Sequence, residues 1–186
     1  MKEFDKKLWL ERAGARLRRA TRRGASSETK KVAEEKWLND VGYIHRMDAL
    51  IGWCSSKGIS VSFGKKGGAT YLTSEKTITM AGRMSPEKQF YYLLHECGHH
   101  LIGYTEEDER FGMGYPKHED ASVNTTFQHK MACLEEEIEA WNRGWKLAKR
   151  LNLNVDRESF DFVRLDCLRS YVKWANGRWS LKSSVS

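Results

Sequence analysis

Three residues near the middle of the chain have the types and the spacing of a zinc site. They are His95, Glu96 and His99, in the order H-E-x-x-H within YYLLHECGHHLIGY. Residues four apart on an α-helix lie one turn apart on the same face, so both imidazoles can bind one ion. Glu96 lies about 100° round the helix from His95, where it reaches a metal-activated water instead of the ion. The pattern therefore predicts Zn²⁺-assisted amide hydrolysis with Glu96 as the catalytic base. The alternative is two surface histidines on an ordinary helix.

A zinc site of this type needs a third protein ligand. In metzincins a histidine and a glycine follow the motif, but those positions hold Thr105 and Ile102, which excludes that class. A helix expected over residues 131–151 offers a set of acidic side chains instead, namely Glu135, Glu136, Glu137 and Glu139. A solvated acidic helix face is the alternative for these glutamates, and we expect it to account for at least two of them.

The two segments LLHECGHHLIG and EEIEAWNRGWKLA resemble ImmA/IrrE-type metallopeptidases, a pattern shared by small phage-encoded HExxH proteins. The resemblance covers roughly residues 75–150. It implies a gluzincin-like zinc peptidase in which Glu137 is the third metal ligand, with Glu139 as the fallback. Trp141 stands where the family usually has Asn, so another group, such as Asn142 or a backbone carbonyl, would have to orient a zinc-bound histidine. Family members often cleave a repressor protein, which implies a protein substrate.

No motif identifies a group that would stabilise the oxyanion of the reaction. Zinc itself does much of this. The side chains that could assist, each of a type that is more often structural than catalytic, are Tyr104, Tyr115, His118, His129 and Tyr171.

The elements that must position these residues predict an α+β fold. Apolar periodicity and capping signals predict helices over 32–57, from Pro86 to near Gly103, over 131–151 and over 157–175. Alternating residues at 59–63, and two short runs within 69–80, predict strands. Residues 105–130 show no periodicity, and a loop of that length is usually functional or mobile. We expect a minimal zincin-like domain: a small antiparallel-containing sheet, an active-site helix and a helix that carries the glutamates.

The basic charge is concentrated at the N-terminus. Residues 1–31 carry the whole excess of the chain, a net charge of +7. We therefore divide the chain into a basic N-terminal helical arm, residues 1–31, and a metallopeptidase domain, residues 32–186, with a linker or helix break at 24–30. Such an arm could bind nucleic acid or an acidic partner. The alternative is a solvated amphipathic helix with its apolar side chains inward, those of Leu8, Trp9, Ala13 and Leu17.

Composition excludes several other classes of protein. The four cysteines form no C-x-x-C pair, so a four-cysteine zinc ribbon is excluded. No apolar run approaches the roughly 18–20 residues that span a bilayer, and the N-terminus lacks the apolar stretch of a secretory signal. We expect a cytoplasmic protein with reduced thiols and no membrane partner.

Three functional hypotheses follow. The first is a cytoplasmic zinc metallopeptidase, a hydrolase acting on a protein or peptide. The second is a nucleic-acid-associated metalloprotein that docks through the basic arm, with a structural zinc site or one that acts on bound proteins. SprT-like proteases share the HExxH layout, but their later His-Gly element is not found here. The third is an interaction protein that binds a host partner through the arm and keeps an inactive site.

Overall fold

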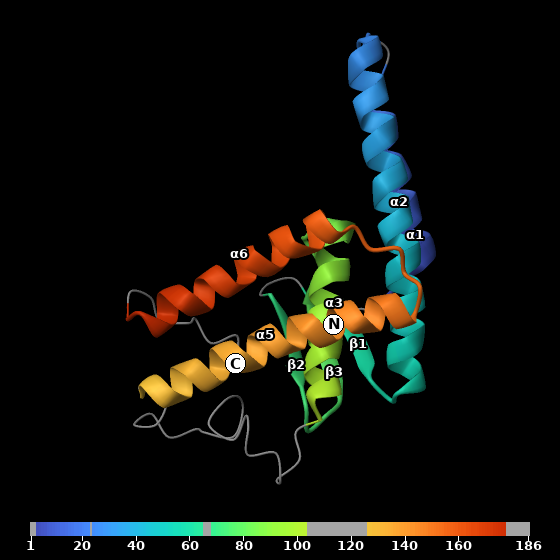
Figure 1. Cartoon of the computed structure of the whole chain (residues 1–186). Coiled ribbons are helices and arrows are strands. Elements are labelled where there is room, and N and C mark those ends of the chain that lie inside the picture. The colour runs from blue at the N-terminus through green and yellow to red at the C-terminus, as the bar shows by residue number, and fades with distance from the viewer. Residues whose placement is uncertain (1–2, 23, 65–67, 104–125, 178–186) are drawn as a thin grey trace. The chain divides into compact units, whose positions relative to one another are not determined.

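A computed structural model describes residues 3–22, 24–64, 68–103 and 126–177. Within these residues the chain has five helices and a three-stranded mixed sheet, which confirms the α+β class (Figure 1). In chain order the elements are α1 (Lys6–Ala20), α2 (Ser27–Ser56), β1 (Ser60–Gly64), β2 (Ala69–Leu72), β3 (Thr77–Ala81), α3 (Pro86–Ile102), α5 (Phe127–Arg150) and α6 (Arg157–Ala175). None of the described helices is both long and apolar enough to cross a membrane.

The chain divides into two compact units. The first comprises residues 1–69 and 77–93, and the second comprises residues 70–76 and 94–186. Helix α3 begins in the first unit and ends in the second. The division at residue 31 that the charge distribution suggests stays a prediction.

In the first unit, side-chain caps set the starts of α1 and α2. Asp5 accepts a hydrogen bond from the Leu8 amide at 3.0 Å, and Ser26 accepts one from the Thr29 amide at 3.1 Å. Because Ser26 is the cap, α2 already begins at Ser27. The linker or helix break predicted over residues 24–30 is therefore present between α1 and α2, but it ends at Ser26. The helix continues to Ser56, and Gly58 follows in the left-handed conformation, with φ at +71°.

Helix α1 lies along α2 (Figure 1). Ala13 is buried, as the amphipathic pattern predicts. Two ion pairs join the helices: Lys6 Nζ lies 2.7 Å from Asp48 Oδ2, and Arg16 Nη2 lies 3.0 Å from Asp40 Oδ2. The α1 helix is thus part of the first unit and anchored to it by both packing and charge.

The sheet has the strand order β1-β3-β2. Strands β1 and β3 are parallel, with a register from Ser60 opposite Thr77 to Gly64 opposite Ala81. Just beyond this pair, the Gly82 amide donates to the Gly64 carbonyl at 2.8 Å, and a Cβ at Gly82 would lie only 2.9 Å from that oxygen. Glycine at this position therefore allows the backbones to approach.

Polar contacts fix the first half of α3 within the first unit. The Tyr43 hydroxyl lies 2.7 Å from the Tyr91 hydroxyl and donates to Glu87 at 3.0 Å. The side-chain nitrogen of Gln89 donates to the Ala81 carbonyl at 2.7 Å. Apolar residues fill the space around these contacts, and the fully buried ones include Ile44, Met47, Leu50, Ile78, Met80 and Phe90.

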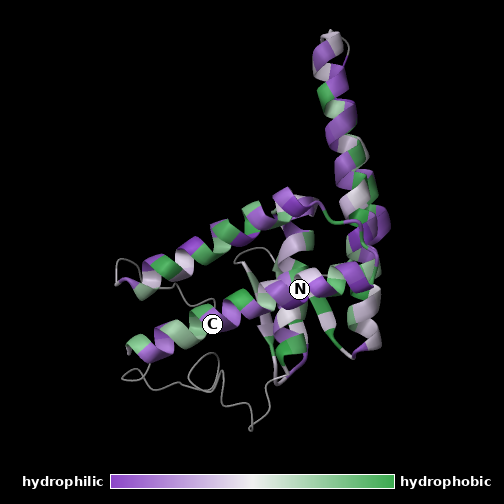
Figure 2. Ribbon diagram, in the orientation of Figure 1, coloured by the Kyte–Doolittle hydropathy of each residue, from purple (hydrophilic) through white to green (hydrophobic). Residues whose placement is uncertain are grey.

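The second unit is built on the close crossing of α3 and α5. A Cβ at Gly98 would lie 1.9 Å from the Ala140 carbonyl oxygen, and one at Gly144 would lie 2.5 Å from the Leu94 carbonyl oxygen. No larger residue fits at either position without moving a helix. Figure 2 shows polar and apolar residues interspersed along α5 and α6, as in helices with one buried face.

Helix α5 begins at Phe127, four residues before the predicted start at 131, and Thr126 caps it by accepting from the His129 amide at 3.2 Å. Helix α6 has the predicted bounds. Its Phe160 ring packs against the rings of Trp141 and Trp145, with centroids 5.4 and 5.1 Å away.

Candidate metal centre

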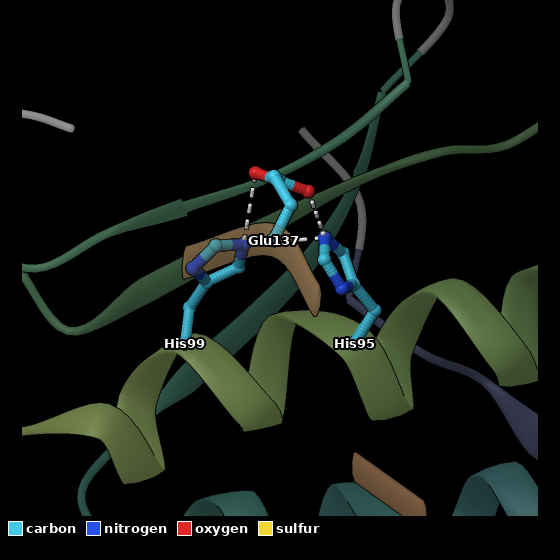
Figure 3. Close-up of side chains that lie close together, drawn as sticks. All are labelled: His95, His99 and Glu137. Carbon is cyan, nitrogen blue, oxygen red and sulfur yellow. Dashed lines mark hydrogen bonds and ion pairs between the residues drawn. The ribbon is translucent and has the colours of Figure 1, made fainter. Parts of the chain in front are cut away.

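Helix α3 projects His95 and His99 from one face, one turn apart, and α5 brings Glu137 over them (Figure 3). The two Nε2 atoms are 3.2 Å apart. Glu137 Oε2 lies 3.0 Å from His95 Nε2, and Glu137 Oε1 lies 3.4 Å from His99 Nε2. Three buried side chains of metal-binding type therefore converge on one point.

These separations match the spacing of ligands around a zinc ion. Ligands at about 2.0–2.1 Å from a tetrahedral zinc lie about 3.3 Å from one another. The three distances, 3.0, 3.2 and 3.4 Å, fall close to that value. A divalent ion with two imidazoles and one carboxylate therefore fits, and a tetrahedral ion would keep its fourth position for a small molecule.

The charge of the centre also suits a cation. Three carboxylates, those of Glu96, Glu136 and Glu137, are buried beside only two histidines. Burial alone lowers the pKa of His99, but the charges of Glu137 and the contact with Glu136 raise it well above its ordinary value. Without a metal the His99 imidazolium balances part of the buried negative charge, and a divalent ion would serve the same purpose.

Glu136 contacts the His99 ring on the side away from Glu137. Its Oε1 lies 3.5 Å from His99 Nδ1, the ring nitrogen that does not face Glu137. Glu136 is almost fully buried, at 1% exposure, so this carboxylate faces no solvent. A carboxylate on the second nitrogen fixes the tautomer and orientation of a metal-binding histidine.

Trp141 lies where the resemblance led us to expect a residue that orients a zinc-bound histidine. Its ring stacks on the His95 imidazole, with centroids 4.5 Å apart and an interplanar angle of 22°. No hydrogen-bond partner is recorded for His95 Nδ1 among the described residues. Stacking thus holds this ring in place of the expected hydrogen bond. The side chain of Asn142, one of the expected substitutes, is exposed to solvent.

Glu96 is buried beside the three converging side chains, at 4% exposure. Burial raises the pKa of its carboxyl group above the ordinary value, and the positive charges of His95 and His99 oppose this. The backbone amide of Tyr71 donates to the carboxylate. A carboxylate with a raised pKa next to a metal centre has the properties of a general base.

The other two glutamates of α5 point elsewhere. Glu135 is exposed. Glu139, the fallback ligand, accepts a hydrogen bond from Arg143 Nε at 2.8 Å, which lowers the pKa of its carboxyl group. The helix therefore directs Glu136 and Glu137 inward and the other two outward or sideways, so Glu137 is the residue that meets both histidines.

Of the side chains considered as oxyanion stabilisers, His129 and Tyr171 lie among the described residues. His129 Nε2 lies 3.3 Å from Cys133 Sγ. Tyr171 is half-buried on α6. His100, the residue after the motif, has its Nδ1 2.9 Å from the Tyr71 hydroxyl. Tyr104, Tyr115 and His118 lie outside the described residues.

Sequence reasoning missed two features of the site. The first is Glu136, to which it assigned no role, because the resemblance gave Glu137 as the ligand and Glu139 as the fallback. Its adjacency to the expected ligand and its place beside apolar residues were the available signals. The second is the helix crossing at Gly98 and Gly144. Glycine costs helix stability, so a glycine within a helical segment is one signal of close packing. The sequence does not separate Gly98 and Gly144 from Gly52, which has open space around it.

No protein-family model, curated protein or solved structure matches this chain.

Proposed function

We propose that this protein is a zinc-dependent peptidase of gluzincin type. The observation that carries the proposal is the convergence of His95, His99 and Glu137 at separations of 3.0–3.4 Å, with Glu96 buried beside them. The similarity to ImmA/IrrE-type metallopeptidases and their phage-encoded relatives supports it, because the motif segments of that resemblance are the ones that form the site. The α+β architecture is compatible with a minimal zincin-like domain.

Each residue has a separate task in this proposal. His95, His99 and Glu137 hold the ion, and Glu136 and Trp141 orient the two imidazoles. Bound zinc would activate a water and polarise the scissile carbonyl. Glu96 accepts the proton of the attacking water and returns it to the leaving amine, a transfer that the raised pKa of its carboxyl group assists. The proposed substrate is a cytoplasmic protein or peptide.

Metal content tests the site. The wild type and the variants His99→Ala, Glu137→Ala, Glu139→Gln and Glu96→Gln are purified without an affinity metal and analysed by elemental mass spectrometry. We expect about one zinc per chain in the wild type and its loss in His99→Ala and Glu137→Ala. Glu139→Gln is the matched control, because it removes an acid from the same helix without touching the ligands, and it should retain zinc.

Glu96→Gln then separates metal binding from catalysis. This variant should keep its zinc and lose at least about 100-fold in cleavage rate, since the general base is gone. Cleavage is measured by mass spectrometry on a diverse peptide library, with and without a chelator. Absence of zinc from the wild type, even after resupply, would refute the metal centre. Zinc without any chelator-sensitive cleavage would leave a structural metal site and refute the peptidase.

A further inference from the structure

A second candidate site lies within the first unit and shares no residue with the metal centre. An open cavity of about 280 Å³ is bounded by α1, α2 and the segment that leads into α3. Its lining residues are Trp9, Arg12, Arg16, Lys36, Asp40, Gly82, Arg83, Met84, Ser85 and Pro86. The volume lies near the lower end of the range for small-molecule sites.

The lining is strongly basic. Four side chains are cations, and Asp40 is the one acid among them, so the cavity carries a net charge of +3. Asp40 is buried and pairs with Arg16 at 3.0 Å and more loosely with Lys36 at 3.9 Å. These contacts place two of the cations beside Asp40, with side chains that are 45% and 68% exposed.

The other two cations have no such partner. Among the residues that the structure describes, no ion pair or hydrogen bond is recorded for the Arg12 or Arg83 side chains. They line the cavity from different elements, α1 and the segment before α3, and both residues are exposed to solvent. Like charges at one cavity repel each other, and an anion between them would relieve that repulsion.

Two further features of the cavity bear on its ligand: a helix N-terminus favours an anion, and an aromatic side chain favours a ligand that carries a ring. The cavity includes Ser85 and Pro86 at the start of α3, a helix of 17 residues whose N-terminal end contributes positive potential. Trp9 supplies an aromatic side chain, and its ring is held in place by Phe4 and Phe63, with centroids 5.9 and 5.6 Å away. An aromatic side chain between arginines is the usual combination for binding a base and its phosphate.

We propose that this cavity binds the phosphate of a nucleotide, either free or as part of a nucleic-acid strand. The four cations bind the phosphate oxygens, and Trp9 contacts the attached base. Binding is therefore confined to one cavity and does not extend over the basic face of α1 as a whole.

The test compares two double variants with the same loss of charge from the full-length protein. Arg12→Gln with Arg83→Gln removes the two unpaired cations of the cavity. Arg18→Gln with Arg19→Gln removes two exposed cations of α1 that do not line it. Binding of a short fluorescein-labelled oligothymidylate is followed by anisotropy over a range of salt concentrations. Adenosine diphosphate is added as a competitor.

The cavity variant should bind the oligonucleotide at least about 10-fold more weakly and lose about two units of salt slope, one for each phosphate contact. The Arg18/Arg19 variant should change affinity by less than about 3-fold. Competition by adenosine diphosphate would identify a free nucleotide as a ligand, and its absence would identify a nucleic-acid strand. Equal losses in both variants, or no binding of either probe by the wild type, would overturn the proposal. Circular dichroism and zinc content, unchanged in both variants, show that fold and metal centre are intact.

Discussion

At the scale of single residues, the candidate metal centre contains two neighbouring glutamates that contact different atoms of the histidines. Glu137 faces the Nε2 atoms of both histidines, and Glu136 faces Nδ1 of His99 from the other side. Sequence spacing predicts that His95 and His99 share one helix face, because residues four apart lie one turn apart. Spacing does not predict which of four glutamates within five positions faces the histidines, since the rotation of α5 about its axis depends on how α5 crosses α3.

A prediction at this scale concerns Glu136. We expect Glu136→Gln to weaken zinc affinity by about 10- to 100-fold, because a neutral amide holds the His99 ring less firmly than a carboxylate does. The affinity is measured by competition with a chromophoric chelator. Glu135→Gln, one residue away and exposed, serves as the control and should bind zinc as the wild type does. Equal affinities in the two variants would show that Glu136 does not orient the ligand.

At the scale of elements, the position of the ligands is set by the distance between two helices. Gly98 and Gly144 let α3 and α5 approach until backbone meets backbone. The sequence predicted both helices, but not the early starts of α2 and α5. The first turn of α2 contains only exposed residues, so its hydrophobic periodicity begins about one turn after the capping residue Ser26. In α5 the first two residues, Phe127 and Gln128, are exposed, and the first buried residue is the polar His129.

Gly98→Ala tests this crossing. The added methyl group would overlap the Ala140 carbonyl, and we expect a loss of about 2–3 kcal/mol in the free energy of unfolding together with weaker zinc binding. Gly52→Ala is the matched control, because Gly52 is also within a helix but is exposed with open space around it. It should gain up to about 1 kcal/mol through helix propensity. Urea unfolding measures both, and a neutral Gly98→Ala would contradict the close crossing.

At the scale of the whole molecule, the features that the sequence does not predict are contacts between residues that lie far apart in the chain. The parallel pairing of β1 with β3 was not foreseen, because it joins segments separated by β2. Helices α1 and α2 are joined by ion pairs between residues 24 and 42 positions apart, and charge composition alone does not locate such partners. The basic excess at the N-terminus was visible in the sequence, but its meeting with Arg83 in one cavity was not.

The buried tyrosine pair predicts how the fold responds to alkaline pH. Burial, and then the contact with Tyr91, raise the pKa of Tyr43 above its ordinary value of 10. A group whose pKa is higher in the folded state stabilises the fold below its unfolded pKa and loses this contribution as the pH rises. The wild type should therefore lose stability above about pH 10, and Tyr43→Phe should lose it less steeply. Thermal unfolding from pH 8 to 11 measures the two slopes, and parallel slopes would exclude Tyr43 as the cause.

The stacking of Trp141 on His95 also gives the protein a built-in optical probe. An indole with its ring centroid 4.5 Å from that of a candidate metal-binding imidazole would be within range of energy transfer to a coloured ion such as Co²⁺. Ion entry and exit would then change the emission of this tryptophan, so the kinetics of metal exchange become measurable on the unlabelled chain.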